Sequence, residues 1–151
     1  MRTALGLLLS MLMFALASGQ PVMNIGDRKV FTATELIAAG TDRAVADIVV
    51  AANLTEVPTF RLSPGQTLKG AGSSVTIQFA LAQDGVQLSS DNQVEGLELR
   101  ADVGRRALFN DTSVERLGRL VLRNLRAAGV IQLLVRDKPC LAMYGLSLIH
   151  I

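Results

Sequence analysis

Two groups of polar residues have types and spacing that could support chemistry. The first group carries carboxylate and amide oxygens, in Asp91-Asn92 and again in Asn110-Asp111. Ca²⁺ binds six or more such oxygens, so Asp91 and Asp111 are candidate ligands for a calcium ion. The alternative, which we favour, is that Asn and Asp occupy turns here because their side chains bond to nearby backbone.

The second group is basic. Gln78, Arg100 and Arg123 follow one another at intervals of 22 and 23 residues, which places them at one position of the repeat described below. Stacked guanidinium groups would suit an acidic polysaccharide, because guanidinium pairs bidentately with carboxylate. Arg100 and Arg123 are therefore candidates for polyanion binding. We favour a solvated outer face instead, because acidic residues that could neutralise it lie nearby: Glu95, Glu98, Asp102 and Glu115.

The composition excludes several other site classes. The single histidine, His150, cannot form a multi-histidine metal site, and the single cysteine, Cys140, cannot form an internal disulfide. No set of catalytic residues can be named. The 15 basic and 13 acidic residues give a net charge of +2, which is too even to predict nucleic-acid binding.

The N-terminus has the pattern of a secretory signal. Arg2 precedes an uncharged apolar run over residues 4–17, and the small residues Ala17-Ser18-Gly19 follow it. The run is shorter than the ~20 residues that span a bilayer. We therefore expect a signal peptide over residues 1–19, export to the periplasm or the cell exterior, and no transmembrane anchor after cleavage.

The other terminus is unusual. Its last six residues, Leu146 to Ile151, match the translation of a transposon end that is used in sequencing libraries. We expect residues 139–151 to form a doubtful tail. Within it, residues 146–151 should derive from such an adapter, have no evolved register with the preceding coil and be poorly packed. On this interpretation the natural protein continues with coils that this sequence lacks.

The segment between these ends begins with a helix signal. Thr32-Ala33-Thr34-Glu35 is a capping box, which predicts a short helix over residues 32–39 with Gly40 as an early interruption. The apolar run at residues 47–51 predicts a buried strand. We assign residues 20–46 to an N-terminal segment with a capping helix and residues 47–138 to the main domain.

Apolar residues then repeat with a period of 22–23. Ile77, Leu99 and Leu122 form one series, and a second series has the same period: Val86, Leu108 and Ile131. An antiparallel sandwich with evenly spaced strands is the alternative. We favour a parallel β-helix, in which each series stacks into one buried column. Leu99 should then contact both Ile77 and Leu122, while Glu98 and Arg100 point outward.

One stereotyped segment, Leu62-Ser63-Pro64-Gly65-Gln66-Thr67-Leu68-Lys69-Gly70, precedes these coils. Together with the capped helix and the strand that follows it, this segment resembles the pectate-lyase-like superfamily over roughly residues 28–138. The resemblance implies an all-β, right-handed, single-stranded parallel β-helix with a short N-terminal capping helix. With the signal-like N-terminus, we expect an exported bacterial member of this superfamily.

Members of that superfamily that cleave pectin use calcium-binding acidic residues with an arginine, or pairs of aspartates. The aspartate signatures of its hydrolases are absent from this chain. We therefore expect an exported surface scaffold or glycan-binding module, with an acidic polysaccharide as its partner. The alternative is a polysaccharide lyase or glycoside hydrolase that acts on such a polymer, with its catalytic coils beyond the end of this sequence.

Overall fold

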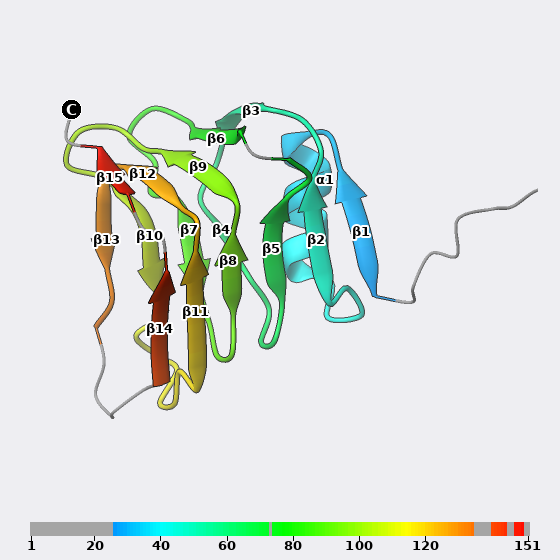
Figure 1. The fold of residues 1–151 in the computed structure, drawn as a ribbon, viewed down its shortest axis with the longest axis vertical. Coiled ribbons are helices and arrows are strands. Elements are labelled where there is room, and N and C mark those ends of the chain that lie inside the picture. The colour runs from blue at the N-terminus through cyan, green and yellow to red at the C-terminus, as the bar shows by residue number, and fades with distance from the viewer. Residues whose placement is uncertain (1–25, 73, 135–139, 145–146, 150–151) are drawn as a thin grey trace, which may run out of the picture.

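The structure is a computed structural model that describes residues 26–72, 74–134, 140–144 and 147–149. These residues wind into a stack of about five β-coils, with one helix at the N-terminal end (Figure 1). Every strand pair is parallel, so the predicted parallel β-helix is confirmed and the antiparallel sandwich is excluded.

Three sheets run along the stack, because successive strands of one coil join different sheets. Sheet A contains β1 (Asp27–Val30), β2 (Asp47–Val50), β5 (Thr67–Gly70), β8 (Gln93–Glu95), β11 (Arg119–Arg123) and β14 (Cys140–Tyr144). Sheet B contains β3 (Leu54–Val57), β6 (Val75–Phe79), β9 (Leu97–Arg100), β12 (Arg126–Ala128) and β15 (Ser147–Ile149). Sheet C contains β4 (Phe60–Arg61), β7 (Val86–Leu88), β10 (Arg106–Asn110) and β13 (Val130–Gln132).

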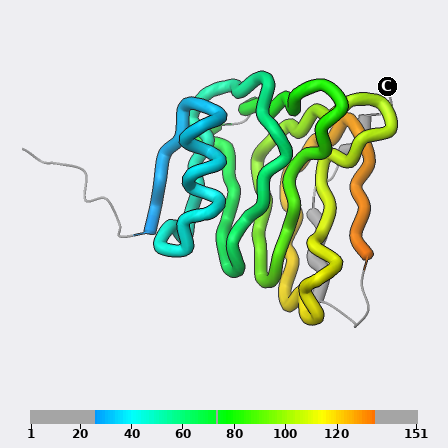
Figure 2. The backbone as a smooth tube through the Cα atoms, turned by 180° about the vertical axis from the view of Figure 1, so that it is seen from behind, coloured from blue at the N-terminus to red at the C-terminus, as the bar shows by residue number. Residues whose placement is uncertain are grey.

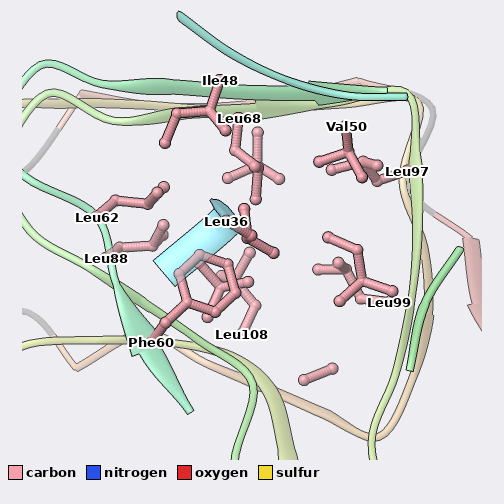
Figure 3. Close-up of a cluster of buried hydrophobic side chains, with 14 of the residues drawn as sticks. Leu36, Ile48, Val50, Phe60, Leu62, Leu68, Leu88, Leu97, Leu99 and Leu108 are labelled. Carbon is pink, nitrogen blue, oxygen red and sulfur yellow. The ribbon is translucent and has the colours of Figure 1, made fainter. Parts of the chain in front are cut away.

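The core is the inside of this coil. Alternate strand residues point inward, and residues at equal positions of successive coils stack on one another. In sheet A, Ile48, Leu68 and Val94 are in register and fully buried. Figure 3 shows how inward side chains from all three sheets meet Leu36 of the helix. No single coil could bury these side chains, so the stack is stable only as a whole.

The helix α1 (Ala33–Thr41) closes the N-terminal end, and Figure 2 shows it beside the first coil. The predicted capping box is present: Thr32 Oγ1 accepts a hydrogen bond from the Glu35 amide at 3.2 Å, and Glu35 Oε2 accepts from the Thr32 amide at 3.2 Å. Gly40 does not interrupt the helix, contrary to our expectation. It is buried inside α1, where an added Cβ would lie 2.7 Å from the Arg61 carbonyl oxygen, so close packing explains this glycine.

The stereotyped segment ties the helix to the coils. Gln66 is buried, and its Nε2 donates to three backbone carbonyls at the end of the helix: Ala39 at 3.0 Å, Asp42 at 2.9 Å and Val45 at 2.9 Å. The carbonyls of Ala39 and Asp42 also accept a backbone amide each, from Asp42 at 3.3 Å and from Val45 at 3.1 Å. One glutamine side chain thus joins the cap to the first complete coil.

The repeat is less regular than the sequence indicates. Leu99 is fully buried in register with Ile77, as predicted, but its neighbour in the next coil is Ala127. The prediction that Leu122 continues this column is wrong, because Leu122 lies in sheet A opposite Val94. The long segment between β10 and β11 and the one-residue turn between β12 and β13 offset each other in length. The sheet C column therefore keeps its period of 22–23, with Val86, Leu108 and Ile131 in register. The sheet B column does not keep this period.

Beyond residue 139 the backbone of two segments continues the coil. β14 pairs in parallel with β11, and β15 pairs in parallel with β12. The backbone of residues 147–149 is therefore in register with the preceding coil, although we expected no register for residues 146–151. The poor packing expected of those residues stays a prediction. The predicted signal peptide at residues 1–19 lies outside the described residues, as do residues 139, 145–146 and 150–151 of the predicted tail.

Candidate functional site

The structure separates the two arginines that the repeat appeared to align. Arg100 lies at the end of β9 in sheet B, where its Nη2 forms an ion pair with Glu98 Oε1 at 2.8 Å. Arg123 lies at the end of β11 in sheet A, in register with Glu95 of the preceding coil. The shared repeat position is therefore wrong, for the same reason that Leu122 does not follow Leu99. Each arginine instead faces a carboxylate on its own sheet.

The acidic candidates lie in turns between sheet C and sheet A. Asp91 has a left-handed backbone with φ of 56°, and its Oδ1 accepts a hydrogen bond from the Arg119 amide at 2.8 Å. Asp111 Oδ1 accepts from the amide and the hydroxyl of Ser113, at 2.9 Å and 2.7 Å. Asp111 thus bonds to groups two residues away, as the turn interpretation predicts, whereas Asp91 accepts from the backbone of the next coil, 28 residues further on.

The amide neighbours of these aspartates are also engaged. Asn92 is buried, and its Oδ1 accepts from the Ser89 amide at 2.7 Å while its Nδ2 donates to the Ser63 carbonyl at 2.8 Å. Asn110 bonds to both backbone groups of Leu134. Among the residues that the structure describes, no three Asp, Glu, His or Cys side chains gather as a metal site would require. Ca²⁺ also binds amide and carbonyl oxygens, so a calcium role for Asp91 and Asp111 stays a prediction.

A different set of polar residues comes together on the outside of sheet C. Arg61, Gln87, Phe109 and Gln132 occupy one in-register row across β4, β7, β10 and β13. Arg61 is exposed, and Gln87 and Gln132 are half-exposed. Phe109 is buried but lies outside the core cluster, beneath the Arg106 side chain. We call this row, together with Asp84, Arg106 and Asp111, the sheet C face.

Arg106 is held on this face by three neighbours. Its Nη2 bonds to Asp84 Oδ2, its Nη1 donates to Gln132 Oε1 at 3.4 Å, and its guanidinium carbon lies 4.1 Å from the centre of the Phe109 ring. Asp84 also accepts from the Arg106 amide at 2.9 Å. The hydrogen bond from the Arg106 side chain lowers the pKa of the Asp84 carboxyl, so this carboxyl is ionised at neutral pH.

Arg61 is fixed in a similar way. Its Nη1 lies 2.9 Å from Asp111 Oδ2, although β7 runs between β4 and β10 in sheet C. The pKa of Asp111 is lowered, chiefly by the Ser113 hydroxyl and amide and also by the Arg61 charge. Both guanidinium groups are thus held by ionised carboxylates.

These ion pairs leave donors exposed. The Arg61 side chain is 48% exposed and that of Arg106 is 38% exposed, whereas those of Asp111 and Asp84 are mostly covered. A guanidinium group has five N–H donors, and each of these two uses only some of them within the described residues. The remaining donors can bond to carboxylate or hydroxyl oxygens of a ligand.

The sequence contained only part of the signal for this face. Asp84 and Arg106 are 22 residues apart, so the period of the repeat could have paired them. Arg61 and Asp111 are separated by two coils of unequal length, and no local pattern joins them. Of the two acidic candidates, the structure includes Asp111 in the sheet C face and places Asp91 beside Arg119.

Comparison of the chain with protein-family models, with curated proteins and with solved structures finds no match. The parallel β-helix is therefore established by the strand pairing alone. Among the described residues, no helix has the length and apolar character needed to cross a bilayer.

Proposed function

We propose that this chain is an exported β-helical scaffold that binds an acidic polysaccharide on the sheet C face. The observation that carries the proposal is the pair of oriented, partly exposed guanidinium groups of Arg61 and Arg106 on one face of a parallel sheet. Export is proposed from the signal-like residues 1–19, and membership of the pectate-lyase-like superfamily from the resemblance of residues 28–138.

The shape of the face suits an extended polymer. Successive strands are ~4.8 Å apart, so a chain that lies along the stack would meet a new side chain at each coil. The amides of Gln87 and Gln132 can both donate to and accept from sugar hydroxyls. The guanidinium groups would bind the carboxylates, because such charge-assisted bonds are roughly twice as strong as neutral ones.

The ionised state of the two carboxyls on the sheet C face supports a binding role more than a catalytic one. A carboxyl that acts as a general acid near neutral pH needs a raised pKa, whereas the pKa values of Asp84 and Asp111 are lowered. Each of these carboxylates orients an arginine. Their charges also reduce the positive potential of the face, so we expect modest affinity that decreases with added salt.

The test is calorimetric titration of the purified chain with polygalacturonate. We expect Arg106→Gln to weaken binding about tenfold or more, because it removes bonds between charged groups. Gln87→Ala should weaken it less and leaves both ion pairs in place. Arg43→Gln is the matched control, since Arg43 is exposed beyond the helix end. Thermal melts of all variants separate loss of binding from loss of fold.

Two results would contradict this proposal. If Arg106→Gln and Gln87→Ala bind like the unchanged chain while Arg100→Gln does not, the binding face is on sheet B. If the chain releases unsaturated uronate products when calcium is added, the protein is a lyase and the scaffold role is wrong.

Methyl-esterified polygalacturonate is the ligand control. It lacks the carboxylate charge and should therefore bind poorly.

A further inference from the structure

Two turns between sheet B and sheet C expose large apolar side chains. Residues 80–83 follow β6, and residues 102–105 follow β9 in the next coil. Leu81 is 78% exposed and Val103 is 80% exposed, the largest exposures among the large apolar residues that the structure describes. The two positions are equivalent, because Gln78 and Arg100 are in register just before them.

Each turn presents its apolar residue in the same way. The amide of the fourth residue donates to the carbonyl of the first, at 3.1 Å in the turn at 80–83 and 2.9 Å in the turn at 102–105. The third residues, Ala82 and Gly104, have left-handed backbones with φ of 59° and 75°. Leu81 and Val103 therefore occupy the second position of tight turns, where the side chain projects from the surface.

Side-chain bonds hold these turns against the stack. Asp102 Oδ2 accepts from the Ala82 amide at 2.8 Å, which links one turn to the other. Thr59 Oγ1 donates to the Asp84 carbonyl at 2.6 Å, which links the first turn to the coil below. Figure 2 shows the turns leaving the same edge of the stack. The apolar tips are thus fixed in place although no described residue covers them.

The size of this surface favours one kind of partner. A stable protein interface buries about 800 Å² on each side, far more than two side chains can supply. Apolar side chains that project singly from a rigid edge can instead enter the boundary between lipid head groups and acyl chains. The shape therefore favours a lipid surface over a second copy of this chain.

The charges near the turns favour the same partner. The Arg100 side chain is 52% exposed, whereas its ion-pair partner Glu98 is only 13% exposed. Arg105 is exposed at the end of the second turn. The acidic side chains nearby, Glu98, Asp102 and Asp84, are only partly exposed. The most exposed charges beside the apolar tips are therefore basic, and they would meet anionic head groups first.

We propose that Leu81 and Val103 insert into the surface of an anionic lipid membrane, with Arg100 and Arg105 against the head groups. This edge adjoins the sheet C face, because Asp84 and Arg106 directly follow the two turns in the chain. The proposal does not depend on the polysaccharide, because neither apolar residue belongs to the sheet C face.

The chain contains no tryptophan, so a single introduced tryptophan reports on one position. We would make V103W, L81W and, as a control at an exposed site on α1, A38W. Every variant keeps the same N-terminus and differs only at the probe. Each would be mixed with vesicles of phosphatidylcholine alone, or of phosphatidylcholine with phosphatidylglycerol, while tryptophan emission is recorded.

We expect the emission of V103W and L81W to shift to shorter wavelength with the anionic vesicles only, and that of A38W to stay unchanged. Replacing both apolar tips by serine should weaken vesicle co-sedimentation about tenfold or more. An unchanged emission of V103W with anionic vesicles would overturn the proposal. So would an equal shift with neutral vesicles, or a concentration-dependent shift without vesicles, which would indicate association of the chain with itself.

Discussion

Arg61 and Asp111 are 50 residues apart in the sequence, yet their side chains form an ion pair across β7, with 2.9 Å between Nη1 and Oδ2. The pair joins a strand of one coil to the end of a strand two coils later. Asp111→Ala should lower the free energy of unfolding by about 1–3 kcal/mol, because Ser113 and Arg61 lose a charged partner. Urea denaturation measures this change.

Glu115→Ala is the control for that measurement, since Glu115 is exposed a few residues further on. Its effect should stay within about 0.5 kcal/mol. Equal effects of the two substitutions would show that the ion pair does not contribute to stability.

Stability should decrease in acid because of two carboxyls on the sheet C face. The pKa values of Asp84 and Asp111 are lowered in the folded chain, so their contribution is complete above the ordinary carboxyl pKa of 3.8. This contribution is lost as the pH falls through the lowered pKa values that the two carboxyls have in the folded chain. Thermal melts over a pH series should show this decrease, and Asp84→Asn with Asp111→Asn should flatten it. A slope that is unchanged in the double variant would assign the decrease to other groups.

Gln66 should contribute more to stability than any exposed glutamine. Gln66→Leu keeps the side chain large but removes the amide that the carbonyls of Ala39, Asp42 and Val45 share as a donor. We expect a loss of about 1–3 kcal/mol in the free energy of unfolding. Gln78→Leu is the matched control at an exposed position of β6 and should change little. Hydrogen exchange of the α1 amides would show whether the helix end opens first.

Two neighbouring glycines should differ sharply. A Cβ at Gly70 would lie 2.3 Å from the Gly96 carbonyl oxygen of the next coil, whereas a Cβ at Gly72 meets no atom within 4 Å. Gly70→Ala should therefore destabilise the chain by about 1–3 kcal/mol because the coils must move apart. Gly72→Ala should be close to neutral in the same thermal melt. Similar melting temperatures for the two variants would contradict the close stacking of these coils.

The sequence predicted those features of the fold that depend on local chemistry. The capping box at Thr32 and Glu35 is a contact between residues three positions apart, and it is present as predicted. The buried strand at Asp47–Val50 is likewise readable from its apolar run. Both depend on interactions within a few residues, which a single sequence contains in full.

The pairing of coils could be predicted only where their lengths are equal. Ile77 and Leu99 are in register at a spacing of 22, but Leu99 and Ala127 are in register at a spacing of 28. The long segment between β10 and β11 lengthens this coil, and the one-residue turn between β12 and β13 shortens it again. The spacing in sheet C therefore stays near 22–23, and the sequence does not show that the spacing in sheet B has changed. The assumption of one constant period placed Arg100 and Arg123 at the same position of the repeat. The same assumption could not pair Arg61 with Asp111, because the two coils between them differ in length.

The position of the cap has a consequence for the order in which the molecule is made. α1 and β1 come before every complete coil in the chain, and β2 pairs with β1 before any later strand is needed. During synthesis, each new coil can therefore pair with the exposed strand edges of the coil before it, which set its register. Folding can proceed vectorially, with about 20–28 residues added at each step, and the open end of the growing stack never exceeds one coil in cross-section. A chain released in reverse order, from its C-terminus, would have to form its first coil without a template.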